Sequence, residues 1–590
     1  MSKFSSYNNY DSSPITAIEG YDDKVFAGSE ELAGEILNAI KLKDRAVVAL
    51  DIYPGVDKSK VLALAKKIAP SEIIDTEITN KEIIDIESAA KPEAVRMEEC
   101  RDFITDDRVF GVICHKKIED FYDEDKVNKI RSEIAKKKGI IVLVGFGTEL
   151  FAKSDIHVFF DISRWEIQLR YRKGMPNWNC TNTDAPVLTK YKIGYFIEWR
   201  LADRYKKIHF DDFDYVVDGN SEDFKAVTGE AFRAGLKEIS TRPFRMEPYF
   251  DPGVWGGKWM QNMLNVGKNE KNLAWCFDGV PEENAINLKF GDVVLQFPTT
   301  DVTLYCPRQL LGERVHGRYG AEFPIRFDFL DTIGGGNLSL QVHPLTEYIQ
   351  DKFGMHYTQD ESYYILDVDR DKQNYVYLGL KTGIDKEEMA ADLRRAEKGE
   401  ISFPAEKYVN KIPVNKHDHV WIPAGTVHCS GEGCMVLEIS ATPYIFTFKL
   451  WDWDRVGLDG LPRPIHVEHG LNNIQWDRDT EYVNRELIHK EQTLLDEEGC
   501  KIERTGLHYR EPIEVERYSI ERPVSIKCDD SVIQGNLVDG REAIIRSEDE
   551  SFPSLTVHYA ESFIIPASVG EFVIEPTDGA AKVLLASIRR

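Results

Sequence analysis

The chain has 590 residues, of which 42% are hydrophobic and 11% aromatic, and its formal net charge is −26. That length exceeds what one hydrophobic core supports, so we expect three domains in a folded, globular protein. The acidic balance argues against nucleic acid and anionic membranes as general partners, although it leaves room for a local basic pocket.

The spacing of the cysteines and the first residues of the chain indicate the cellular compartment. The nine cysteines are scattered and include no CxxC pair, so they do not form a recognisable disulfide framework. Residues 1–7 are polar and lack the apolar core of a signal peptide, and no run approaches the roughly 18 apolar residues of a membrane helix. We therefore expect a reduced, soluble, cytoplasmic protein, and the oligomeric state stays open.

The first 240 residues alternate between strand and helix patterns. Unbroken apolar runs, which are typical of parallel strands buried on both faces, occur at residues 46–50, 140–145 and 157–160. Helical patterns occur at residues 61–65, 125–137 and 221–240. This alternation predicts an α/β domain with a doubly wound parallel sheet over residues 1–240.

The segment Asp51–Ser59 lies between a strand and a helix, where a phosphate-binding loop would lie. Its last two residues match the Lys-Ser end of that motif, but Ile52 and Asp57 stand at its glycine positions. Without glycine the backbone N–H groups cannot wrap a phosphate, and an aspartate there repels it. Residues 161–173 resemble the lid of uridine-kinase-type enzymes. We expect a kinase-like domain without phosphotransferase activity; an altered phosphotransferase and an unrelated α/β fold stay open.

From about residue 243 onward, short strands, aromatic residues and Gly/Pro turns predict jelly-roll barrels. We expect a first barrel over residues 243–480, with a helical insertion at 386–398, and a second over residues 481–590. Ile565–Glu571 weakly repeats Ile422–His428 and has Glu571 at the place of the histidine. The second barrel is therefore expected to bind no metal.

Four side chains in the first barrel region form a candidate metal site. Gln341 and His343 are two residues apart on one predicted strand, so their side chains point to the same face. Glu361 leads another strand, and His428 follows a tight Pro-Ala-Gly turn. An isolated histidine is better explained as a structural residue, but these segments reinforce one another. Together they provide the mixed nitrogen and oxygen donors that a divalent metal needs.

The Pro423-x-Gly425-x-x-His428 pattern resembles the second motif of cupins. Five segments in order narrow the resemblance to the class I, zinc-dependent mannose-6-phosphate isomerases, over about residues 243–590. These segments are Val254–Gly257, Leu338–Pro344, Glu361–Leu366, Ile422–His428 and Trp451–Val456.

The resemblance implies one zinc ion per chain, held by Gln341, His343, Glu361 and His428, with another divalent metal as an alternative. It also implies that Arg455 is the active-site arginine. The implied activity interconverts mannose 6-phosphate and fructose 6-phosphate, or a close sugar phosphate, through a cis-enediol.

The chain departs from this family at two positions that usually hold lysine, which here are Gln359 and Asp328. Arg326 and Lys258 are the candidates to replace these cations. Because of the departures, a non-catalytic sugar-phosphate sensor stays an alternative, as does a phosphotransferase in residues 1–240. The sequence does not identify the base that moves the proton. His417 and His419 flank a turn, and we expect both to be solvated.

Overall fold

The computed structural model describes residues 9–69, 81–442, 446–457, 460, 463–506 and 508–590. The polar residues 1–7 lie outside this part. The chain divides into two compact units. The α/β unit comprises Ile15–Ile239 and Ala285–Cys306, and the β unit comprises Met1–Pro14, Ser240–Asn284 and Pro307–Arg590. Within the described residues, we find no helix with both the length and the apolar character needed to cross a membrane.

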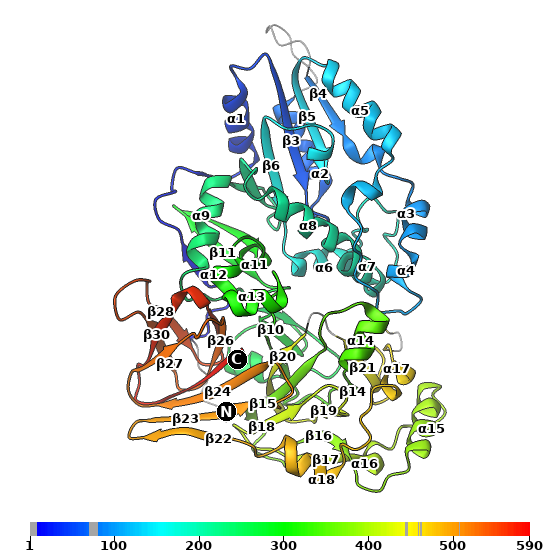
Figure 1. The fold of residues 1–590 in the computed structure, drawn as a ribbon, viewed down its shortest axis with the longest axis vertical. Coiled ribbons are helices and arrows are strands. Elements are labelled where there is room, and N and C mark those ends of the chain that lie inside the picture. Colours follow the sequence, from blue (N-terminus) through cyan, green and yellow to red (C-terminus); the bar gives the residue numbers. More distant parts are fainter. Residues whose placement is uncertain (1–8, 70–80, 443–445, 458–459, 461–462, 507) are drawn as a thin grey trace. The chain divides into compact units, whose positions relative to one another are not determined.

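A seven-stranded sheet forms the centre of the α/β unit (Figure 1). Its strand order is β2-β8-β7-β6-β3-β5-β4; the five strands from β7 to β4 are parallel, and β8 and β2 continue the sheet antiparallel. The strands are β2 (Val25–Phe26), β3 (Arg45–Ile52), β4 (Lys81–Asp85), β5 (Gly139–Gly145), β6 (Ile156–Asp161), β7 (Tyr215–Asp218) and β8 (Lys225–Thr228). Strands β5 and β6 are buried along their whole length, which explains their unbroken apolar runs.

The helices of this unit are α1 (Ser29–Ile40), α2 (Lys58–Ile68), α3 (Glu93–Glu99), α4 (Arg101–Ile104), α5 (Glu124–Lys136), α6 (Arg164–Arg172), α7 (Val187–Ile193), α8 (Trp199–His209), α9 (Gly229–Ile239) and α11 (Thr300–Tyr305). The helix predicted over residues 221–240 is wrong in its first half. It begins only at Gly229, because residues 225–228 pair with β7 as strand β8.

A small sheet of β1 (Ile15–Ala17), β11 (Ala285–Phe290) and β12 (Val293–Pro298) also belongs to the α/β unit. The segment from β11 to α11 is tied to the parallel sheet by a buried ion cluster. Lys206 of α8 contacts Asp161 at the end of β6 and Asp301 in α11, and all three are buried. A lysine shared by two buried carboxylates satisfies charges that would otherwise be costly to bury.

The first barrel of the β unit consists of two sheets, β18-β15-β20-β13-β10-β9 and β17-β16-β19-β14-β21. Its strands are β9 (Tyr249–Asp251), β10 (Trp275–Gly279), β13 (Arg326–Asp331), β14 (Leu340–Val342), β15 (Asp360–Val368), β16 (Tyr375–Leu380), β17 (Val409–Pro413), β18 (His419–Ile422), β19 (His428–Ser430), β20 (Cys434–Ala441) and β21 (Phe448–Trp451). Helix α15 (Lys386–Glu397) confirms the insertion predicted at 386–398.

The second barrel consists of the sheets β22-β23-β24-β31-β26-β29 and β25-β30-β27-β28. Its strands are β22 (Gln492–Glu497), β23 (Cys500–Gly506), β24 (Ile513–Ile520), β25 (Val524–Lys527), β26 (Ile533–Asp539), β27 (Glu542–Arg546), β28 (Leu555–His558), β29 (Ser562–Ile565), β30 (Glu571–Pro576) and β31 (Ala581–Ile588). Their inward residues form one apolar core. Further helices of the β unit are α10 (Trp259–Met263), α12 (Pro307–Leu311), α13 (Glu313–Tyr319), α14 (Thr346–Phe353), α16 (Ala405–Tyr408), α17 (Val467–Leu471) and α18 (Thr480–Tyr482).

The two barrels meet where β18 lies against β23, and this seam corrects one prediction. His419, expected to be solvated, is buried and bonded on both ring nitrogens, to Thr505 Oγ1 at 3.0 Å and Ser362 Oγ at 2.8 Å. Trp421 Nε1 also donates to the carbonyl of Thr505. Burial, together with the charge of Arg517, lowers the pKa of His419 to about 3. The turn that looked exposed in the sequence is covered by a strand of the other barrel.

Candidate metal centre

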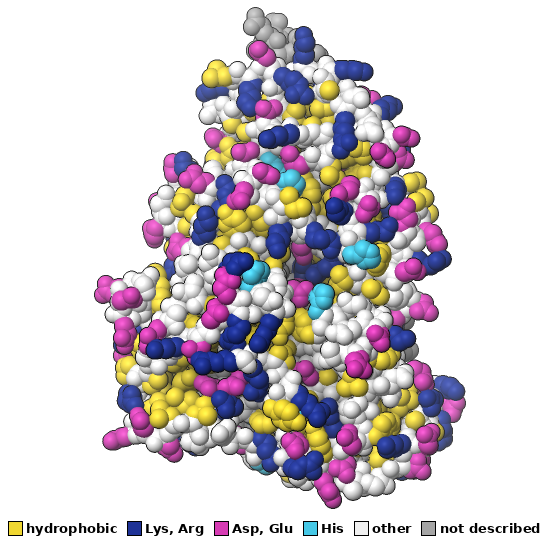
Figure 2. All heavy atoms as spheres, in the orientation of Figure 1, with side chains coloured by type: hydrophobic (Ala, Val, Ile, Leu, Met, Phe, Trp, Pro, Cys, Tyr) yellow, Lys and Arg dark blue, Asp and Glu magenta, His cyan; other side chains and the backbone are white. Residues whose placement is uncertain are grey.

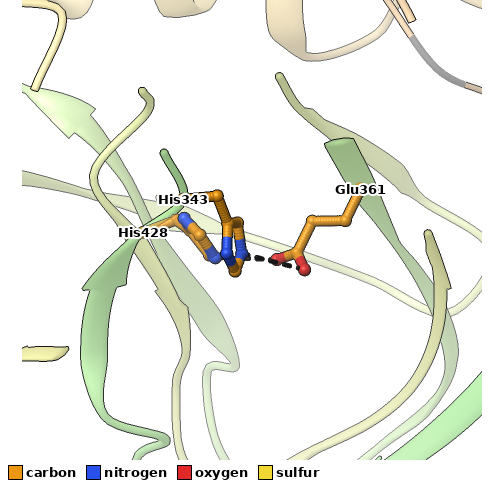
Figure 3. Close-up of side chains that lie close together, drawn as sticks. All are labelled: His343, Glu361 and His428. Carbon is orange, nitrogen blue, oxygen red and sulfur yellow. Dashed lines mark ion pairs between the residues drawn. The ribbon is translucent and has the colours of Figure 1, made fainter. Parts of the chain in front are cut away.

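Strands from both sheets of the first barrel bring the candidate ligands together. Gln341 in β14 lies directly opposite His428 in β19, so their side chains share a face. His343 follows two residues after Gln341 and points the same way. Glu361 comes from β15 of the other sheet and faces these residues across the barrel interior (Figure 3).

The distances in the cluster are those of metal ligands around a common point. Glu361 Oε2 lies 3.0 Å from His343 Nε2, and Glu361 Oε1 lies 2.7 Å from His428 Nε2. One ligand atom from each residue lies within 4.8 Å of the others, and all three side chains are fully buried. Gln341 Nε2 lies 3.3 Å from His428 Nε2, so an amide group borders the same point.

Backbone carbonyls set which imidazole nitrogen faces the centre. His343 Nδ1 lies 3.0 Å from the carbonyl of Phe446, and His428 Nδ1 lies 2.8 Å from that of Thr426. If each Nδ1–H donates to its carbonyl, each Nε2 presents a lone pair to Glu361. Within the described residues, His343 Nε2 and Glu361 Oε1 make no hydrogen bond of proper geometry. Two lone pairs against a buried carboxylate need a cation, so this donor set fits a divalent metal.

The charges of the cluster stabilise one another. Burial alone would raise the pKa of Glu361, but the two imidazoles lower this pKa well below its ordinary value. Burial also opposes protonation of His343, yet the Glu361 carboxylate raises the pKa of that histidine. Glu361 also accepts a hydrogen bond of 3.1 Å from Gln359 Nε2. The amide of Gln359 thus orients the carboxylate.

Two further carboxyl groups share the barrel interior. Asp328 of β13 lies opposite Glu438 of β20, and Glu438 lies opposite Tyr363, two residues from Glu361 on the same face of β15. Burial raises the pKa of Asp328 to about 7, with Arg326 opposing and Glu361 reinforcing the shift. Burial and the charges of Glu361 and Asp328 also raise the pKa of Glu438 well above its ordinary value. These carboxyls can hold protons near neutral pH.

Cations on the same interior face come from two strands. Arg326 lies two residues before Asp328, so it shares that face of β13, and it is buried. Lys449 of β21 lies opposite Gln341 and shares its face; sequence reasoning missed it, because this placement depends on the pairing of β21 with the distant strand β14. Lys258 is exposed and its ammonium contacts the carbonyl of Lys271. Lys258 is therefore not a candidate for a cation inside the barrel.

Arg455 lies in the turn after β21. Its Nη2 is 2.6 Å from Asp452 Oδ1, and its Nε donates to the Asp452 carbonyl. Asp452 also pairs with Arg463 at 2.9 Å. Among the described residues, the contacts of Arg455 run to Asp452 and not to the four predicted ligands.

Comparisons with known proteins give one family match and several matches to individual proteins. Residues 28–241 match a family described as a domain of unknown function, DUF8485. Mannose-6-phosphate isomerase ManA of Bacillus subtilis is 23% identical over 345 residues, which is 57% of this chain and 97% of that protein. The chain is homologous to mannose-6-phosphate isomerases over 57% of its length.

Other relatives carry similar descriptions. The probable mannose-6-phosphate isomerase GmuF of Bacillus subtilis is 24% identical over 338 residues, covering 57% of this chain and 97% of that protein. The crystal structure of the mannose 6-phosphate isomerase from Bacillus subtilis matches with a TM-score of 0.47 and 19% identity, covering 58% of this chain and 99% of that one. A putative mannosephosphate isomerase from Archaeoglobus fulgidus gives a TM-score of 0.44 and 16% identity, with coverages of 59% and 98%. The sequence relatives confirm homology to mannose-6-phosphate isomerases, while the class I type, the metal and the substrate stay predictions.

Proposed function

We propose that this protein is a metal-dependent aldose–ketose isomerase of the class I, zinc-dependent type. It would interconvert mannose 6-phosphate and fructose 6-phosphate, or a close sugar phosphate. The observation that carries this proposal is the buried cluster of His343, Glu361 and His428 in a chain homologous to mannose-6-phosphate isomerases. Homology alone would allow a binding protein, but a preformed donor set supports chemistry at this point.

One divalent ion, with zinc as the first candidate, would be held by Gln341, His343, Glu361 and His428. When bound, such an ion acts as a Lewis acid that polarises a carbonyl oxygen. The backbone carbonyls of Phe446 and Thr426, by accepting from the two Nδ1–H groups, would leave Nε2 of each imidazole facing the metal.

The proton transfer needs a group that can both accept and donate near neutral pH. Isomerisation moves a proton between adjacent carbons of the sugar through a cis-enediol. Asp328 and Glu438 are suited to this step because their pKa values are raised towards the working range of a general acid or base. Arg326, Lys449 and Arg455 are our candidates for binding the phosphate, since guanidinium and ammonium groups are the usual phosphate partners.

We further propose three domains: a kinase-like, doubly wound α/β domain over residues 1–240, the metal-binding barrel over 243–480, and a metal-free barrel over 481–590. The contacts within the Asp51–Ser59 loop support the interpretation that this loop does not bind phosphate. Asp57 accepts hydrogen bonds from the backbone and hydroxyl of Ser59, at 2.9 and 2.7 Å. Lys58 contacts Asp85 at 2.7 Å and Glu87 at 2.6 Å. The groups that would bind a phosphate are engaged by the chain's own carboxylates.

A coupled assay for fructose 6-phosphate formed from mannose 6-phosphate tests the proposal. The full-length protein is assayed after zinc loading and after treatment with a chelator. We expect turnover only with metal, restored when zinc is added back. Zinc bound at one equivalent without turnover would contradict the isomerase and favour the sugar-phosphate sensor, which the two missing family lysines suggest.

A further inference from the structure

The second barrel opens into a cavity of about 640 Å³ that the proposed isomerase reaction does not use. Strands β23, β24, β25 and β31 line it, together with helix α13 and the last residues of the chain. Its volume is that of small-molecule sites, which are typically about 300–1,000 Å³. None of the proposed metal ligands lines it, so it is a separate site.

The wall of this cavity breaks the normal pattern of a β-sandwich. Inward-facing residues of such folds are apolar, and Tyr518 of β24 follows that rule as part of the core. Two and four residues earlier, Glu516 and Glu514 point to the same side by strand alternation. Arg504 of β23 lies opposite Glu516 and faces them. The inner face thus changes from apolar to charged towards one end of the barrel.

Two arginines on this wall share one carboxylate. Glu514 lies between two guanidinium groups, 2.8 Å from Arg504 Nη2 and 2.9 Å from Arg589 Nη1. One carboxylate therefore serves two cations. Within the described residues, the buried Nε of Arg504 has no hydrogen-bond partner. A buried N–H without an acceptor is costly, and a ligand oxygen in the cavity would remove that cost.

The rim adds further positive charge. Arg314 of α13 donates to the backbone carbonyls of Ile588 and Arg589, at 2.9 and 2.7 Å, and the nearby charges of Asp529 and Asp530 act on it as well. Burial and the neighbouring charges of Arg318 and Arg590 lower its pKa, as expected where cations crowd. Lys527 is exposed and has no ion pair within the described residues.

Overall, five basic side chains line the cavity against three acidic ones, in a chain whose net charge is −26. Figure 2 shows Lys and Arg side chains beside a hydrophobic area on the second-barrel part of the face that is drawn. A basic cavity with an apolar floor on an otherwise acidic protein points to an anionic ligand with a carbon skeleton.

We propose that this cavity binds a small phosphorylated or carboxylated polyol through its anionic group. Arg504 Nε, Arg314 and Lys527 hold the anion, because charge-assisted hydrogen bonds to phosphate or carboxylate oxygens are the strongest that these groups make. Ile502 and Leu585 pack against the carbon skeleton, and Glu516 accepts hydrogen bonds from hydroxyl groups.

Isothermal titration calorimetry on the full-length, chelator-treated protein tests this. The protein carries H343A and H428A, so that the proposed catalytic site contributes no metal-dependent binding. The probes are inorganic phosphate, fructose 6-phosphate and gluconate. We expect saturable binding at one site per chain, weakened at least 10-fold by Arg504→Gln and a few-fold by Lys527→Gln. Arg546→Gln is the matched control, since Arg546 of β27 pairs with Glu575 of β30 and does not line the cavity; it should leave the affinity unchanged.

Tighter binding of fructose 6-phosphate than of phosphate and gluconate would support a phosphorylated ligand, and tighter binding of gluconate a carboxylated one. No saturable binding of any probe would overturn the proposal, as would unchanged affinity in a folded Arg504→Gln protein. If that variant does not fold, the exposed Lys527→Gln substitution decides by the same criterion. Because no turnover is measured, failure of the isomerase would leave this test intact.

Discussion

The two barrels of the β unit share an architecture and differ in what their inner faces carry. In the first barrel, His343, Glu361 and His428 converge in the fully buried interior. In the second, Glu571 stands at the place of His428 in the sequence repeat, and it is exposed and bonded to Ser525 Oγ. The inward-facing charged side chains of the second barrel lie instead at one open end, around Arg504 and Glu514. The scaffold therefore does not determine the chemistry; the polarity of a few inward positions does.

Removing one imidazole from the first barrel tests this contrast with the largest expected effect. His343→Ala or His428→Ala leaves too few donors to hold the ion and should lower both bound zinc and turnover at least ~100-fold. Metal content and the coupled assay measure the two losses. Glu571→Ala, the equivalent change in the second barrel, should alter neither. Full turnover in a metal-free H343A/H428A protein would refute the proposed metal site.

The raised pKa of Asp328 predicts a pH dependence of stability that originates in the first barrel. Its folded-state pKa of about 7 lies above the ordinary value of 3.8, so the folded protein binds more protons than the unfolded chain between these pH values. This group therefore makes the free energy of unfolding fall as pH rises from about 4 to about 7, by on the order of 3 kcal/mol. Asp328→Asn should remove that fall.

Urea unfolding of the chelator-treated protein at several pH values measures this effect. Asp539→Asn is not a suitable control, because the charge of Asp539 is itself engaged by His417 and Lys416. Asp578→Asn, on an exposed turn of the second barrel, serves better. Equal pH profiles for the wild type and Asp328→Asn would show that Asp328 titrates normally.

The seam between the barrels should give the smallest effect. His419→Ala removes two buried hydrogen bonds and leaves Thr505 and Ser362 without that partner, at a cost of about 1–3 kcal/mol in unfolding free energy. Denaturant unfolding at neutral pH measures the change. His356→Ala is the matched control because that histidine is exposed in the same barrel. A loss no larger than in the control would mean that the barrels are not held together here.

Local patterns in the sequence were sufficient for much of the fold and for the cluster itself. Apolar runs marked β3, β5 and β6, and strand alternation placed Gln341 and His343 on one face. What could not be predicted depends on pairing between distant segments. Lys449 joins the interior only because β21 pairs with β14, about 100 residues earlier in the chain. His419 is buried only because β23, far along the chain, covers its turn.

The two faces of strand β23 meet different parts of the β unit. Arg504 faces the cavity of the second barrel, and the next residue, Thr505, faces the other way and bonds to His419. His419 in turn bonds to Ser362, the chain neighbour of Glu361. A shift of this one strand would therefore act on the arginine wall on one side and, through His419 and Ser362, on the strand that carries a proposed metal ligand on the other.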